Sequence, residues 1–137
     1  MLMCLLFVSP LWAMGDGHGQ GVFPTVEGER VRYHAYIEMP RATVSGIAVL
    51  MREGGVVRGS LFNEFGLTAL DFTYDLQRRR VTLHHVVAMM DKWYVRRVIR
   101  RDMARLMRCL EQGETQYRNE GRRINYQFLP MAHEVTE

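Results

Sequence analysis

Histidine is the first candidate for chemistry, because imidazole binds metals and exchanges protons near neutral pH. His84 and His85 are adjacent in a segment with strand character, so their side chains would point to opposite faces of a sheet. His18 and His34 have no acidic or cysteine partner at ligand spacing, and zinc sites generally need three or four ligands. The sequence therefore predicts no metal site and no cofactor.

Cysteine and carboxylate side chains are the other candidates for catalysis. Cys109 has no histidine near it in the sequence, and its neighbours Leu106 and Leu110 favour a packing role. Glu64 and Asp71 lie on consecutive predicted segments, but no motif sets the separation that an acid–base pair needs. We therefore predict a protein that is not an enzyme.

Arginine supplies most of the positive charge. The chain has 18 Lys and Arg against 15 Asp and Glu, a net charge of +3. One face of a predicted helix carries a basic patch made of Arg97, Arg100, Arg101 and Arg108. A basic surface attracts phosphate, so an anionic membrane or envelope surface is one expected partner. Nucleic acid is not expected, because Tyr94 is the one aromatic residue on that face and no known module is recognisable.

Asp102 stands out because its helical angle places it inside the apolar side of the same helix, between Ile99 and Leu106. A buried carboxylate without a partner is costly. We expect a structural salt bridge from Asp102 to Arg105 or to an arginine of the sheet.

These side chains are held by a chain of 137 residues, which is the size of one domain. Hydrophobic residues make up 47% and charged residues 24%, a composition that excludes a disordered chain. Two cysteines exclude both a disulfide scaffold and a multi-cysteine zinc module.

The first part of the domain shows strand periodicity. Polar and apolar residues alternate strictly from Arg30 to Met39, which is typical of a half-buried strand. Further strands are predicted over 43–52, 56–62, 68–74 and 81–87, separated by short turns. Gly46 interrupts the second strand and indicates a bulge or bend. Strands joined by such short turns form an antiparallel meander.

The period then changes to that of a helix. Asp91 is a suitable N-cap and Gly113 a suitable residue after the C-cap, with about 30 Å of helix between them. A hairpin over 115–120 and 122–129 is predicted to follow. The predicted fold class is α+β, a curved antiparallel β-sheet (a half-barrel-like meander) covered by one long amphipathic helix.

The N-terminus predicts export. Residues 1–15 are uncharged, too short to span a membrane and end in small residues, as in a secretory signal peptide. A buried N-terminal strand or helix is the alternative. Residues 16–28 read as a flexible leader, and 29–130 as the single domain. The expected location is the periplasm or the periphery of the outer membrane.

Large apolar side chains could line a space between sheet and helix. Methionine suits an adaptable cavity, although it suits a packed core equally well. The candidate cavity residues are Tyr33, Ile37, Leu50, Phe62, Phe72, Met89, Trp93, Ile99 and Met103.

The order of these segments resembles a group of small, uncharacterised cell-envelope proteins of Gram-negative bacteria. The residues that carry the resemblance are Gly46, Asn63-Glu64-Phe65-Gly66, Asp71-Phe72 and Arg100-Arg101-Asp102. This group is similar to the LolA/LolB half-barrel superfamily, whose characterised members carry or receive lipoprotein acyl chains. The resemblance implies a curved sheet closed by helices over an apolar cavity, and it brings no catalytic residue. Fewer strands are predicted here than in that superfamily, which favours a domain shortened at its C-terminus.

Sequence and resemblance together predict an exported envelope protein that binds an apolar ligand or lipidated partner, such as a lipid, an acyl chain or a lipoprotein. Two alternatives stay open. The interior is a filled core of a structural or interaction module, or the arginine-rich helix face binds anionic envelope surfaces.

Overall fold

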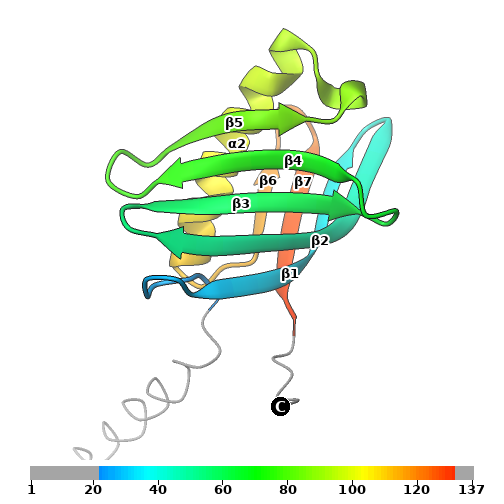
Figure 1. The fold of residues 1–137 in the computed structure, drawn as a ribbon. Helices are drawn as coiled ribbons and strands as arrows, with labels where there is room; N and C mark the ends of the chain where they lie inside the picture. The colour runs from blue at the N-terminus through cyan, green and yellow to red at the C-terminus, as the bar shows by residue number, and fades with distance from the viewer. Residues whose placement is uncertain (1–21, 132–137) are drawn as a thin grey trace, which may run out of the picture.

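A computed structural model of the chain describes residues 22–131, and seven antiparallel strands form one curled sheet (Figure 1). The strands are β1 (Arg30–Met39), β2 (Ala42–Glu53), β3 (Val56–Asn63), β4 (Thr68–Asp75), β5 (Arg80–Val86), β6 (Gln116–Asn119) and β7 (Ile124–Pro130). Their order across the sheet is β5-β4-β3-β2-β1-β7-β6. The predicted strands and the α+β fold class are confirmed.

The last strand of the chain pairs with the first. Ile37 in the middle of β1 lies opposite Val44 of β2 on one side and opposite Tyr126 of β7 on the other. In Figure 1 the sheet curls so far that β7 and β6 run behind β2–β5 and at a steep angle to them. The curl gives the sheet a deep concave face.

A single α-helix within residues 22–131 fills the opening of this half-barrel. The chain passes from β5 through a short 3₁₀ turn, η2 (Ala88–Met90), into α2 (Trp93–Glu111). Helix α2 contacts β5 and β6, which are the two edge strands of the sheet. It therefore bridges edges that lie at opposite ends of the strand order.

Backbone chemistry sets the ends of α2. Gly113 has a φ of +89°, its amide donates to Leu110, and the next amide, of Glu114, donates to Cys109. This is a Schellman motif, and it confirms the predicted role of Gly113. The predicted N-cap is wrong by one residue: Lys92 holds that position without a side-chain cap. The Asp91 carboxylate instead pairs with Arg96 at 3.1 Å.

Alternation along the strands sends one set of side chains into the concave face, as a period of two requires. Gly46 is needed where β2 and β3 approach closely, because a Cβ there would lie 1.7 Å from the carbonyl oxygen of Phe62. The irregularity expected at Gly46 falls on the next strands instead. The register shifts between Leu61 and Phe62 of β3, and between Asp71 and Phe72 of β4.

The described part of the predicted leader packs against the barrel. Phe23 is buried, with its ring perpendicular to that of Tyr74, and the Tyr33 hydroxyl donates to the Val22 carbonyl. Glu29 closes a turn by accepting from the amides of Thr25 and Val26. Residues 22–28 are thus tied to the core, where the sequence predicted a flexible leader. The predicted signal segment, 1–15, lies outside the described residues.

Candidate functional site

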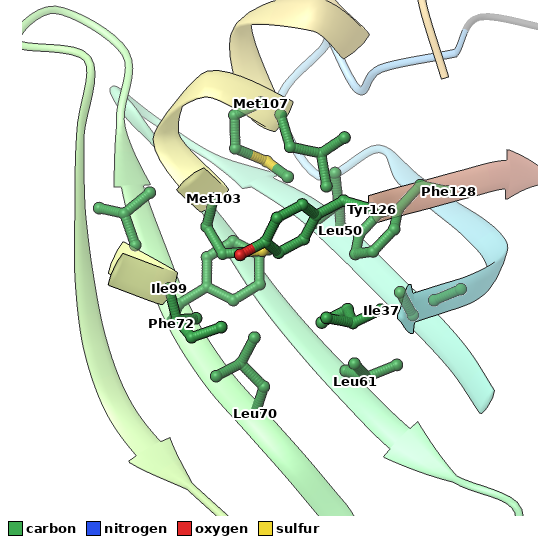
Figure 2. Close-up of a cluster of buried hydrophobic side chains, with 14 of the residues drawn as sticks. Ile37, Leu50, Leu61, Leu70, Phe72, Ile99, Met103, Met107, Tyr126 and Phe128 are labelled. Carbon is green, nitrogen blue, oxygen red and sulfur yellow. The ribbon is translucent and has the colours of Figure 1, made fainter. Parts of the chain in front are cut away.

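Six of the nine candidate cavity residues meet in the interior beneath α2. Strand residues lie on one side and helix residues Ile99 and Met103 on the other, as Figure 2 shows. The six are Tyr33, Ile37, Leu50, Phe72, Ile99 and Met103, and none is more than 2% exposed. They form one hydrophobic cluster, to which Leu61, Leu70, Met107, Tyr126 and Phe128 also belong.

The other three candidates lie outside this cluster. Phe62 is half-buried and faces Ile47 on the outer side of the sheet, because Leu61 takes the inward position. Met89 in η2 and Trp93 at the start of α2 are exposed, at 54% and 73%. Both were chosen as large apolar side chains, and residue type alone does not show whether such a side chain is buried.

Asp102 lies inside the protein, 2% exposed, but its partners are neutral. The Tyr126 hydroxyl donates to Oδ2 at 2.6 Å, and the Asn119 amide donates to Oδ1 and Oδ2 at 3.0 and 2.9 Å. The salt bridge expected for Asp102 is therefore replaced by hydrogen bonds from β6 and β7. Arg105, the expected partner, donates to the Tyr117 hydroxyl at 2.9 Å instead.

The surroundings of Asp102 also determine the protonation state of the Tyr126 hydroxyl. Burial, and then the Asp102 carboxylate, raise the pKa of Tyr126 far above its ordinary value of 10.0. The hydroxyl therefore stays protonated and remains a donor at any ordinary pH. Tyr126 and Asn119 hold α2 against the β6–β7 hairpin.

The described histidines, Cys109 and the candidate carboxylates do not form a common site, and His18 lies outside the described residues. Within residues 22–131, no three metal-ligating side chains lie close enough to hold an ion. His84 and His85 are exposed and hydrogen-bond to Thr73 and to the Thr68 carbonyl, respectively. Burial first, and then Glu114, raise the pKa of the Cys109 thiol, which disfavours the reactive thiolate.

The two candidate carboxylates are held apart by separate hydrogen bonds. Glu64 accepts from Ser45, and Asp71 accepts from Ser60. Each serine ties its carboxylate to a neighbouring strand, and no hydrogen bond joins the two acids in the described part of the chain. The arrangement gives neither carboxylate a partner for acid–base chemistry.

The most distinctive polar feature is a groove between α2 and the start of β5, which we call the arginine groove. It has a volume of about 370 Å³, with Val81 and Ala104 as its apolar lining. Six exposed arginines line it: Arg79, Arg80, Arg100, Arg101, Arg105 and Arg108. Guanidinium groups present planar forks of donors that match phosphate and carboxylate oxygens.

None of these six arginines forms an ion pair with a carboxylate of the described chain. The ion pairs found there join Arg58 to Glu53, Arg96 to Asp91, and Arg118 to Glu120. A hollow lined by charges of one sign concentrates the electrostatic field and attracts counter-ions. The groove is therefore a cationic surface whose arginines form no ion pair within residues 22–131.

The predicted basic patch overlaps this groove in part. Arg100, Arg101 and Arg108 line it, whereas Arg97 lines a second hollow at the start of the helix. The prediction missed Arg79, Arg80 and Arg105. The run of arginines at 78–80 directly before a strand was a visible signal, but only the packing of β5 on α2 brings that run to the helix.

The second hollow, which we call the aromatic corner, lies beside the β6–β7 turn and has a volume of about 300 Å³. Its lining residues are Trp93, Tyr94, Arg97, Val98, Arg101 and Arg122. Arg101 lines both hollows, so the two adjoin at this side chain.

Comparison with family models, curated proteins and solved structures finds no match to this chain. The resemblance to the LolA/LolB superfamily therefore stays a prediction. No helix in the described part of the chain is long and apolar enough to cross a membrane.

Proposed function

We propose that this protein is a binding protein without catalytic activity, and that it holds a multiply charged anion in the arginine groove. The observation that carries the proposal is the set of six arginines around one concave surface without a carboxylate partner in the described chain. Bringing like charges together is unfavourable in the free protein. An anion with several charges relieves this repulsion and gains charge-assisted hydrogen bonds.

The anionic component of a cell envelope is the partner that we expect, since the N-terminal segment favours export. Phosphate-type groups fit the groove best, because several guanidinium forks can each bind two oxygens. The apolar floor of Val81 and Ala104 leaves the arginines as the groups that recognise the ligand.

The test is calorimetric titration of the protein with inorganic polyphosphate at several salt concentrations. Arg100→Glu/Arg108→Glu reverses two groove charges and changes the net charge from +3 to −1, since each substitution subtracts two. Arg32→Glu/Arg41→Glu makes the same change at exposed positions that do not line the groove. The groove variant is expected to lose affinity by about tenfold or more, and the control by less than about threefold. Equal losses in both variants would show that net charge, not the groove, binds the polyanion.

An apolar ligand is a second candidate, favoured by the interior cluster under α2. Helix residues Met103 and Met107 lie at the seam between α2 and the sheet, and methionine side chains repack readily. Because the six interior candidates are packed against one another, an acyl chain must separate α2 from the sheet to enter.

Hydrogen exchange tests this second candidate directly. If a fluorescent fatty acid enters beneath α2, the amides of residues 93–111 exchange faster when it is added. Binding of the fatty acid with unchanged exchange in α2 would place it elsewhere and refute entry under the helix.

A further inference from the structure

The aromatic corner contains an exposed tryptophan, which is unusual because tryptophan is buried for most of its surface in most proteins. Trp93 is 73% exposed and its neighbour Tyr94 is 52% exposed. Both line one hollow together with three arginines, Arg97, Arg101 and Arg122. Large apolar rings that line a hollow instead of the core indicate a binding surface.

The orientation of the two rings narrows the class of ligand. Their planes are perpendicular, at 88°, with the ring centroids 5.6 Å apart. Consecutive bases of a nucleic acid stack on flat aromatic platforms, and two perpendicular rings do not offer two parallel platforms. Two perpendicular rings can instead contact one face and one edge of the same compact, saturated ring of a ligand. The C–H groups of a sugar suit it, because aromatic faces carry negative charge density.

The charges around the corner extend into the arginine groove. Arg101 borders both hollows, so cationic side chains continue along α2 from Arg97 to Arg108. The arginine groove has a volume of about 370 Å³ and the aromatic corner one of about 300 Å³. The two hollows therefore have room for more than one unit of a polymeric ligand. A ligand that fits both must carry rings and several negative charges.

We propose that the protein binds an anionic oligosaccharide, with one sugar ring in the corner formed by Trp93 and Tyr94 and its anionic groups along the arginine groove. This inference rests on the proposed function and names the class of its ligand. The anionic groups are phosphate, sulfate or carboxylate, all of which accept from guanidinium forks.

Three probes separate the roles of ring and charge: a heparin-derived hexasaccharide, inorganic polyphosphate and a single-stranded thymidine oligonucleotide. Trp93→Ala removes the larger ring of the aromatic corner. Because Trp93 is 73% exposed, we expect this variant to fold normally. Phe65→Ala is the matched control, because Phe65 is 82% exposed in the β3–β4 turn and does not line either hollow. Circular dichroism checks the fold of both variants.

The expected result is a loss of about tenfold in hexasaccharide affinity for Trp93→Ala, with less than about twofold change for polyphosphate. Phe65→Ala should alter neither affinity. The inference fails if Trp93→Ala leaves hexasaccharide binding unchanged, or if it lowers polyphosphate binding as much. It also fails if the oligonucleotide binds more tightly than the hexasaccharide and loses more affinity in Trp93→Ala, which would indicate base stacking.

The same titrations distinguish this inference from the function on which it rests. If polyphosphate binds and the groove variant abolishes it while Trp93→Ala changes nothing, the anion site stands and the sugar site falls. If neither polyphosphate nor the hexasaccharide binds the unaltered protein, both proposals are refuted.

Discussion

Removal of the Tyr126 hydroxyl is expected to destabilise the fold strongly, because this hydroxyl is one of the donors to the buried carboxylate of Asp102. The oxygen–oxygen distance of 2.6 Å is that of a charge-assisted hydrogen bond. Such bonds contribute about 1.5–3 kcal/mol. Asp102 is 2% exposed, so water does not replace the missing donor. We expect Tyr126→Phe to lower the free energy of unfolding by about 2–3 kcal/mol.

This loss converts into a measurable change of melting temperature. The unfolding entropy is about 2.1 cal/mol/K per residue, or about 0.23 kcal/mol/K for the 110 residues from 22 to 131. A loss of about 2–3 kcal/mol then lowers the Tm by about 9–13 °C. Thermal and urea unfolding, followed by circular dichroism, measure the two quantities independently.

Tyr117→Phe is the matched control, since Tyr117 lies opposite Tyr126 in the β6–β7 pair and its hydroxyl bonds the exposed Arg105. That hydrogen bond is open to solvent, so its loss should cost less than about 0.5 kcal/mol. Equal, small effects of both substitutions would refute the assignment of Tyr126 as a support of the Asp102 carboxylate. A large effect of Tyr117→Phe alone would locate the support on the exposed side of α2.

Three further outcomes are expected. Burial raises the pKa of Tyr33 and Tyr126 above the ordinary 10.0, so above pH 10 the unfolded chain releases protons that the folded chain keeps. These two tyrosines should leave the free energy of unfolding intact below pH 10 and lower it by up to about 2.7 kcal/mol per pH unit above it, and Tyr74, whose pKa burial also raises, adds to the fall. Urea unfolding at pH 9–11 that shows no such fall would contradict this. Gly46→Ala should lower the free energy of unfolding by about 1–3 kcal/mol, because the β3 backbone occupies the space that the new Cβ needs. Gly55→Ala, with open space around it, should change the Tm little. Similar Tm values for the two variants would refute the close approach of β2 and β3. The raised pKa of the Cys109 thiol predicts slow alkylation by iodoacetamide at pH 8 that speeds up in urea; equal rates with and without urea would be the contrary result.

The strands were predictable because polar and apolar residues alternate strictly in β1 and because short turns separate the apolar segments that follow. The helix was predictable for the same kind of reason, with Gly113 marking its end. Its start was misplaced because Asp91 is a good N-cap by residue type, yet its carboxylate pairs with Arg96 instead.

Partners across the fold were not predictable. Asp102 was correctly placed on the buried side of the helix, but the sequence suggested arginine as its partner. The real donors, Asn119 and Tyr126, belong to strands that follow the helix, and only the return of β7 to β1 brings them under α2. The sequence predicted the groove arginines Arg100, Arg101 and Arg108 on the helix. It did not predict Arg79 and Arg80, because they reach the groove through the contact of β5 with α2.

The pairing of the first strand with the last has a consequence during synthesis of the chain. From Met39 at the end of β1 to Ile124 at the start of β7 there are 85 positions (124 − 39). At a synthesis rate of about 5–20 residues per second, β7 is made roughly 4–17 s after β1. During that time the edge of β1 that pairs with β7 has no partner strand. An unpaired strand edge attracts other chains, and charged side chains oppose such contacts. Arg30, Arg32 and Glu38 along β1 would keep neighbouring nascent chains from pairing with this edge until β7 arrives.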